Sequence, residues 1–142
     1  MPNGGDYLIQ GHPIAPEPWL YTHLFLEAVD AALLMHANQA RKGTTIPYIS
    51  HLFGACSIAF DYGANEDEAI AALLHDAIED VHYMFGARET VAAFGPEVLR
   101  IVEACTDADK KRKPPWRKRK IAYLARLAEA DRPILLVSAS DK

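Results

Sequence analysis

The chain has 142 residues, half of them hydrophobic and 24% charged, which suits one globular domain with a core of its own. No apolar run approaches the ~20 residues of a membrane-spanning helix, and the first residues lack the pattern of a signal peptide, so neither feature is expected. The net charge of −4 is unevenly spread: residues 110–120 contain eight of the fifteen Lys and Arg, and the rest of the chain has seven basic against nineteen acidic residues. This distribution argues against a nucleic-acid-binding face and favours a small anionic ligand or a partner.

The two cysteines, Cys56 and Cys105, lie far apart in apolar surroundings and form no CxxC pair. This pattern is typical of small buried side chains in a reducing compartment. We therefore expect a cytoplasmic protein, with formation of a homo-oligomer left open.

The first part of the chain predicts an irregular arm followed by two helices. Residues 1–18 hold four of the nine prolines in no periodic pattern, which indicates an N-terminal arm ahead of a domain over residues 19–142. Apolar residues then recur at spacings of three and four over residues 20–41, which predicts a helix that ends near Gly43. A second apolar helix is expected over residues 48–62.

The middle of the chain carries clear helix-start signals. Asn65 and Glu68 have the spacing of a capping box, which predicts a helix over residues 66–80. Further helices are expected over residues 87–94 and over residues 96–106, the second with a proline at its favoured first position.

The last part of the chain predicts two more apolar segments. Residues 116–129 have a one-sided apolar pattern, with Trp116 expected to anchor that helix in the core. Residues 133–141 form an apolar run that ends in a charge. No hairpin signal such as NG or DG between alternating residues occurs, so the fold class predicted is all-α in a single domain.

Residues 75–80, with the sequence HDAIED, carry the strongest chemical signal. On a helix His75, Asp76, Glu79 and Asp80 crowd one turn, directly after an apolar run. Carboxylates beside a core repel one another and lose hydration, and a cation relieves both costs. An exposed acidic helix face is the alternative, but the preceding apolar run indicates that this end of the helix points inward.

A metal shell needs donors from elsewhere in the chain. His51 lies on the preceding helix, and Asp141 ends the last apolar run, where a buried helix can deliver a carboxylate to an interior site. Two imidazoles and two carboxylates without a thiolate suit Mn²⁺, Fe²⁺ or Co²⁺. Glu79 and Asp80, one turn beyond the ligands, could hold a water molecule or accept its proton.

Three segments in the same order resemble one known family. Residues 36–51, HANQARKGTTIPYISH, are similar to the first motif of the HD hydrolase domain of the RelA/SpoT family and of its short relatives, the small alarmone hydrolases. Residues 71–80, AALLHDAIED, resemble the second motif, and residues 94–106 resemble the segment that follows. The resemblance covers roughly residues 25–142 and implies a helical bundle of the HD-domain type.

The resemblance assigns roles to individual residues. Those implied as ligands of Mn²⁺ are His51, His75, Asp76 and Asp141. The acidic pair Glu79 and Asp80 is implied to activate or orient the hydrolytic water. Arg41 and Lys42 match a basic pair near the nucleotide, the arginine against the guanine base, and Tyr48 occupies a matching position.

The activity implied is hydrolysis of the 3′-pyrophosphate of guanosine tetra- or pentaphosphate, with GDP or GTP and pyrophosphate as products. Two other functions stay open: an HD phosphatase acting on another nucleotide or phosphorylated cofactor, and a non-catalytic nucleotide-binding module. No nucleic-acid or membrane partner is expected.

The end of the chain departs from the family pattern. The family continues with an asparagine and a further helix after the aspartate that matches Asp141, whereas this chain ends at Lys142. We therefore expect a truncated C-terminal part and a poorly anchored Asp141. The basic segment 110–120 also departs, and it is expected to be mainly a solvated loop.

Overall fold

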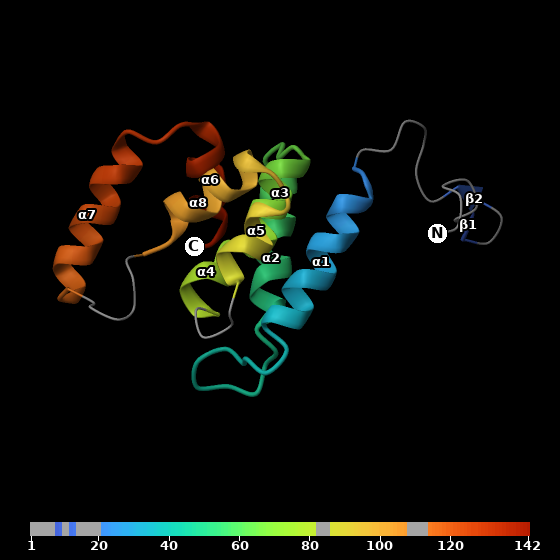
Figure 1. Ribbon diagram of the computed structural model, residues 1–142, viewed down its shortest axis with the longest axis horizontal. Helices are drawn as coiled ribbons and strands as arrows, with labels where there is room; N and C mark the ends of the chain where they lie inside the picture. The colour runs from blue at the N-terminus through green and yellow to red at the C-terminus, as the bar shows by residue number, and fades with distance from the viewer. Residues whose placement is uncertain (1–7, 10–11, 14–20, 82–85, 108–113) are drawn as a thin grey trace.

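The computed structural model describes residues 8–9, 12–13, 21–81, 86–107 and 114–142 (Figure 1). The helices and strands in these ranges are β1 (Leu8–Ile9), β2 (His12–Pro13), α1 (His23–Met35), α2 (Ile49–Asp61), α3 (Glu66–Leu74), α4 (Ala77–Asp80), α5 (Ala87–Ala92), α6 (Pro96–Cys105), α7 (Trp116–Ala128) and α8 (Arg132–Ser140). The prediction of an all-α domain is confirmed for the described residues 21–142. In the same ranges, no helix is both long and apolar enough to cross a membrane.

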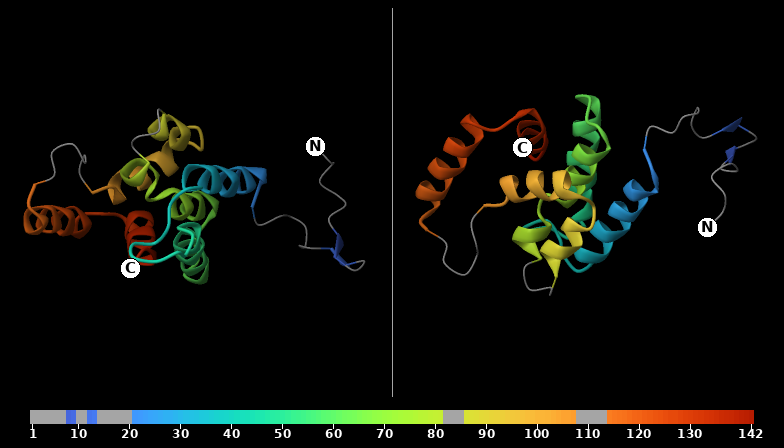
Figure 2. Two further views of the ribbon diagram at one scale, coloured as in Figure 1. Left: turned by 90° about the horizontal axis from the view of Figure 1, so that it is seen from below. Right: turned by 45° about the horizontal axis from the view of Figure 1, so that its top comes forward.

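Helix α3 is the centre of the fold. It packs against α1, α2, α6 and α8, and Figure 2 shows it surrounded by other elements. Residues 68–74 of this helix are all buried, so the helix is covered on every side, as an apolar run without a polar face requires. The predicted capping box is confirmed, because the Asn65 side chain accepts from the Glu68 backbone and the Glu68 carboxylate accepts from the Asn65 backbone.

The N-terminal segment contains a feature that the sequence pattern did not predict. Strand β1 pairs with β2 in antiparallel register inside the predicted irregular arm, with Ile9 opposite His12. Two-residue strands are too short to produce a detectable alternation of apolar and polar residues, which is why the pattern missed them.

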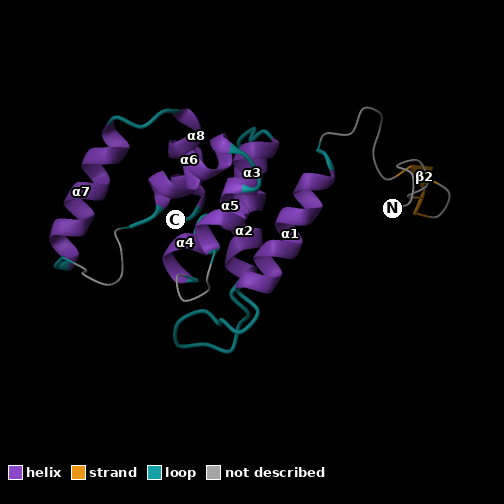
Figure 3. Cartoon of the chain, viewed as in Figure 1, coloured by secondary structure: helices purple, strands orange, loops and turns teal. Residues whose placement is uncertain are grey.

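The predicted end of the first helix was wrong. Helix α1 ends at Met35, about six residues earlier than expected, and a long loop leads to α2 (teal in Figure 3). Backbone pairs close this loop: the Arg41 amide donates to the Ile46 carbonyl at 2.9 Å and the Tyr48 amide donates to Gln39 at 2.9 Å. These long-range partners replace helical bonds, and a periodicity count cannot detect them.

The helix predicted over residues 66–80 is divided into α3 and α4 at His75 and Asp76. The His75 ring contacts the Ala72 carbonyl oxygen at 2.7 Å through Nδ1, so it competes for an acceptor that a continuing helix would use. Asp76 has φ −95° and ψ −2°, which turns the chain and begins α4 in a new direction. The break lies between the two residues with the strongest chemical signal.

Helix α7 stands apart from the other helices (Figure 1). Tyr123 is its only fully buried side chain, and Trp116 is 67% exposed. The expectation that Trp116 anchors the helix in the core was therefore wrong. Tyr123 does so instead, through a hydrogen bond between its hydroxyl and that of Ser138 on α8.

Candidate metal centre

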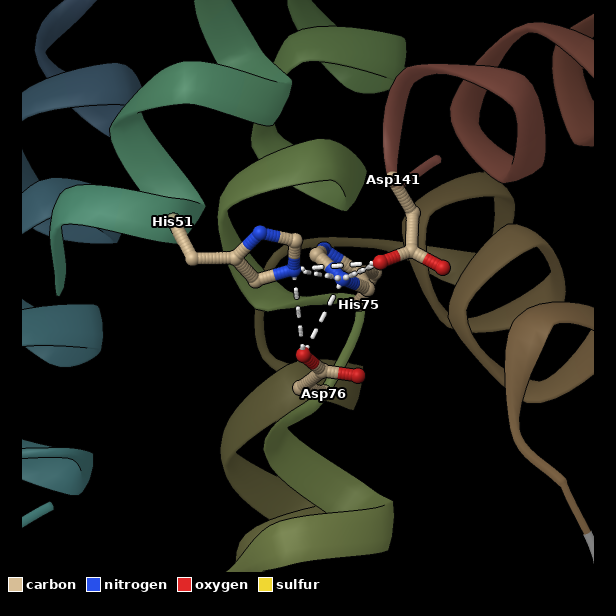
Figure 4. A group of neighbouring side chains, drawn as sticks. All are labelled: His51, His75, Asp76 and Asp141. Atoms are coloured by element: carbon tan, nitrogen blue, oxygen red, sulfur yellow. Dashed lines mark hydrogen bonds and ion pairs between the residues drawn. The ribbon is translucent and has the colours of Figure 1, made fainter. Parts of the chain in front are cut away.

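Four side chains from three parts of the fold meet at one point (Figure 4). They are His51 of α2, His75 and Asp76 at the turn between α3 and α4, and Asp141 at the end of α8. One ligand atom from each lies within 4.8 Å of the others. His51 Nε2 lies 3.3 Å from His75 Nε2 and 3.1 Å from Asp141 Oδ1, and His75 Nε2 lies 3.1 Å from Asp76 Oδ2.

His75 is the most deeply buried of the four, with 3% of its surface exposed. Its Nδ1 donates to the Ala72 carbonyl oxygen, so the lone pair of Nε2 is directed at the cluster. Burial by itself would lower the pKa of His75, but the hydrogen bonds to Asp141 and Asp76 outweigh it and raise the pKa to about 10.

Asp76 is held by Tyr48, whose hydroxyl donates to Asp76 Oδ2 at 2.5 Å. Burial would raise the pKa of Asp76, but the hydrogen bond with His75 and the one from Tyr48 lower it. Burial and the neighbouring Asp76 carboxylate raise the pKa of the Tyr48 hydroxyl, which therefore stays a donor. Tyr48 thus supports a candidate ligand and lines the adjoining cavity.

Asp141 is better anchored than expected. Its amide donates to the Val137 carbonyl at 3.2 Å, and α8 packs against α2, α3 and α6. Burial opposes ionisation of Asp141, but hydrogen bonds with His51 and His75 and the Lys142 ammonium hold its pKa well below the usual range. The carboxylate is therefore ionised and directed at the cluster.

The donor set fits a divalent cation. Two imidazole nitrogens and two carboxylate oxygens converge, while the second nitrogen of His75 and an oxygen of Asp76 are held by other protein groups. Such outer partners orient metal ligands in proteins. The mixed nitrogen and oxygen set, with no thiolate among these four, matches ions such as Mn²⁺, Fe²⁺ and Co²⁺.

A cavity of about 230 Å³ opens beside the cluster. Its lining residues are Tyr48, Asp76, Glu79, Asp80, Cys105, Asp107, Lys120, Tyr123, Asp141 and Lys142. The predicted acidic pair of α4 therefore faces the same space as two of the candidate ligands.

Glu79 and Asp80 are each tied to a distant segment. Glu79 Oε2 accepts from the Asp107 amide at 3.2 Å, and Asp80 Oδ2 accepts from Gln39 Nε2 at 3.0 Å. Burial is the main reason that the pKa of Glu79 is raised, and the nearby carboxylates of Asp76 and Asp80 add to it, although the bond from Asp107 opposes it. A carboxylate with a raised pKa is a better proton acceptor.

The sequence did not predict that Asp107 and Lys120 would line the same cavity as Glu79 and Asp80. Asp107 is buried and pairs with Arg119 at 2.9 Å and with Lys120 at 3.5 Å, which brings part of the basic segment 110–120 to the cavity. The expectation of a solvated loop was therefore wrong for Lys120, and residues 108–113 lie outside the described residues. The ammonium group of Lys120 also lies 5.6 Å from the centre of the Tyr123 ring.

The sequence contains only weak signals for the positions of Asp107 and Lys120. The Asp107 position follows directly on the third family-like segment, and Lys120 falls in the strongest charge run of the chain. Neither feature identifies which lysine turns inward, and the one-sided apolar pattern is no guide either, because Ile121 and Leu124 of α7 are exposed.

Arg41 and Lys42 do not line the cavity. Both side chains are exposed on the loop between α1 and α2, which Figure 3 shows below α4. Of the residues implied for nucleotide binding, Tyr48 alone lies at the cavity, and the roles of the other two stay a prediction.

Comparison with known proteins supports the resemblance seen in the motifs. The HD domain family model matches residues 28–142. The guanosine-3′,5′-bis(diphosphate) 3′-pyrophosphohydrolase MESH1 of Xenopus tropicalis is 37% identical over 122 residues, which are 84% of this chain and 65% of that protein. The MESH1 protein of Homo sapiens is 40% identical over 87 residues, 58% of this chain and 46% of that protein. This chain thus spans between about half and two thirds of these relatives.

A solved structure agrees with the same relationship. It is described as a metazoan ortholog of SpoT that hydrolyzes ppGpp, and it matches with a TM-score of 0.74 and 29% identity over 89% of this chain and 68% of that chain. The family model covers most of the sequence, and the shared helical architecture and the four convergent candidate ligands agree with it. The chain belongs to the HD domain family.

Proposed function

We propose that the protein is a divalent-metal-dependent phosphohydrolase that removes the 3′-pyrophosphate of guanosine tetra- or pentaphosphate. The observation that carries the proposal is a cluster of two imidazoles and two carboxylates beside a cavity, which is lined by those two carboxylates, the acidic pair and two ammonium groups. The names of the two MESH1 relatives describe this activity for those proteins.

His51, His75, Asp76 and Asp141 would hold the metal ion, with Mn²⁺ as the leading candidate. When bound, such an ion supplies Lewis-acid stabilisation of phosphoryl charge and acidifies water. His75 and Asp76 are prepared for this role by their bonds to Ala72 and Tyr48, which keep their donor atoms directed at the cluster.

Glu79 and Asp80 would orient the attacking water and accept its proton. Water adds to the phosphorus attached to the ribose 3′-oxygen, the bond from that phosphorus to the 3′-oxygen breaks, and the 3′-oxygen leaves with a proton. The products are pyrophosphate and GDP or GTP. Lys120 and Lys142 would neutralise phosphate charge on the other side of the cavity.

The first experiment is pyrophosphate release from guanosine tetraphosphate with Mn²⁺, beside His75→Ala and a panel of other nucleotides. Selective release that depends on Mn²⁺ and is lost in the variant supports the proposal. Tight nucleotide binding without product, measured by calorimetry, would replace it with a non-catalytic binding module.

A second candidate is a phosphatase acting on another nucleotide or phosphorylated cofactor. The exposure of Arg41 and Lys42 outside the cavity favours it, because the resemblance implied Arg41 against the guanine base and Lys42 near the nucleotide. Under the alarmone proposal Arg41→Ala raises the KM for guanine nucleotides selectively. An equal effect on pyrimidine nucleotides would favour the second candidate.

The cytoplasm is the compartment proposed, on the support of two cysteines that are both free thiols. A small-molecule nucleotide is the proposed partner, with no nucleic acid, and self-association is the property to test by sedimentation.

A further inference from the structure

A chain of side-chain hydrogen bonds connects the loop after α1 to the acidic pair. His36 Nδ1 lies 2.7 Å from Gln39 Oε1, and Gln39 Nε2 donates to Asp80 Oδ2 at 3.0 Å, across 41 residues of sequence. His36 is 3% exposed, so this support is shielded from water. Asp80 in turn lines the cavity beside the candidate metal ligands.

The backbone holds the middle of this chain in place. The Gln39 amide donates to the His36 carbonyl at 3.1 Å, and the Gln39 carbonyl accepts from the Tyr48 amide at 2.9 Å. Gln39 is therefore fixed at both its backbone amide and its carbonyl, which holds the residue where its side chain bonds Asp80. The early end of α1 makes this geometry possible.

The chemistry of the three groups fixes the direction of donation. An ionised carboxylate only accepts, so the NH₂ group of Gln39 must face Asp80 and its carbonyl oxygen must face His36. His36 Nδ1 must then carry the proton. His36 Nε2 is buried and has no hydrogen-bond partner among the described residues, so no second hydrogen bond competes for the orientation of the ring.

The same ring supports the neighbouring carboxylate through Tyr48. The rings of His36 and Tyr48 are stacked, with centroids 5.3 Å apart and planes inclined by 26°, and the Tyr48 hydroxyl donates to Asp76. One stacked pair thus reaches a candidate metal ligand through Tyr48 and the water-orienting carboxylate through Gln39.

We propose that His36 and Gln39 are positioning residues that orient the Asp80 carboxylate for the hydrolytic step. Neither touches the cavity, and both act through the amide of Gln39. The role in turnover rests on the proposed phosphohydrolase function, whereas the direction of donation is a property of the folded protein alone.

Gln39→Glu is the central test, because it keeps the size of the side chain and removes the donor that faces Asp80. Gln39→Met removes both polar atoms at similar volume. We expect both variants to lower kcat by about ten- to a hundredfold while KM and the Kd for Mn²⁺ change less than about threefold, since orientation and not binding is lost. The matched control is Asn38→Asp, the same amide-to-acid change at the exposed neighbouring position, which should leave kcat unchanged.

A second measurement does not depend on activity. Long-range ¹H–¹⁵N NMR of the wild-type chain should find the Nδ1-protonated tautomer for His36, assigned by its loss in His36→Asn. Gln39→Met should convert that ring toward the Nε2-protonated form.

Wild-type kcat in Gln39→Glu, or an Nε2-protonated His36 in the wild type, would overturn the proposal. A parallel loss of Mn²⁺ affinity would also overturn it, because the pair would then support the metal ligands instead. If the wild type turns over no nucleotide, the proposed phosphohydrolase function fails. The measured tautomer of His36 then tests by itself whether His36 donates to Gln39 and Gln39 to Asp80.

Discussion

The cavity has two walls that differ in how firmly the fold holds them. The first wall, which we call the inner wall, consists of Asp76, Glu79, Asp80 and Asp141, together with the neighbouring His51 and His75; these residues come from α2, α4, the end of α8 and the turn after the buried central helix α3. The second, the outer wall, consists of Lys120 and Tyr123 from α7 and of Lys142. His75 is 3% exposed, whereas the side chain of Lys120 is 40% exposed and its helix buries only Tyr123.

This difference indicates a division of work between the walls. Metal ligands need fixed geometry, and groups on packed helices provide it. Side chains that meet a substrate must let it enter and leave, which suits a helix at the edge of the fold. We expect substitutions in the inner wall to affect metal binding and those in the outer wall to affect substrate binding.

The largest effect is expected for His75→Ala. It removes a buried candidate ligand and leaves His51 as the one imidazole of the cluster beside Asp76 and Asp141. We expect Mn²⁺ affinity to fall by more than about a hundredfold and activity to be lost with it. Calorimetry checks this, with His23→Ala as control, because the His23 side chain is 66% exposed and pairs with Glu27 away from the cluster. Unchanged Mn²⁺ binding would place the metal elsewhere.

Lowering the pH should weaken Mn²⁺ binding by the residues of the inner wall. The pKa of His75 is raised to about 10 in the metal-free protein, so below that pH a proton must leave before a cation binds. Mn²⁺ affinity should therefore rise with pH by up to about tenfold per unit and should level off above the pKa. Calorimetry in two buffers with different ionisation enthalpies measures the released proton, and an affinity independent of pH would contradict the prediction.

Tyr48→Phe tests the support of the inner wall. The ring can still stack on His36, but the hydrogen bond to Asp76 is lost. We expect Mn²⁺ affinity to fall by about tenfold, the lower end of the range for partners of metal ligands. Tyr62→Phe is the matched control, because Tyr62 is 73% exposed. Equal affinities in the two variants would show that the hydroxyl does not hold the ligand.

Lys120→Met tests the outer wall and should have a smaller effect. A partly exposed charge near a phosphate is screened by water, so we expect KM to rise by about three- to tenfold with little change in Mn²⁺ affinity. Lys118→Met on the exposed side of α7 is the control. If Lys120→Met lowered metal affinity instead, the division between the two walls would be wrong.

The smallest effect is expected for Trp116→Ser. This side chain is 67% exposed at the start of α7, so its loss should change the free energy of unfolding by less than about 0.5 kcal/mol. Denaturant unfolding checks it beside Tyr123→Ala, which removes the buried anchor of the same helix. A larger loss for Trp116→Ser would mean that α7 is held by its first turn.

Much of this protein follows from local sequence signals. Most helices were predicted from signals that act within a few residues. These signals are apolar residues at spacings of three and four, the capping box at Asn65 and the proline at the start of α6. The cluster of His75 and Asp76 after an apolar run likewise predicted an inward-facing group of ligands. His51 and Asp141 could be named from their helix positions and from the family resemblance.

Contacts between distant segments were decided only by the tertiary structure. The bond from Gln39 to Asp80 and the inward turn of Lys120 each depend on a partner more than ten residues away. The end of α1 at Met35 accompanies backbone pairs in the following loop that join residues five and nine positions apart. Periodicity reports which face of a helix is apolar, but it carries no information on which polar group lies opposite. The sequence by itself therefore determined the helices and the candidate ligands, while the packing around α3 decided the walls of the cavity and the side chains that orient them.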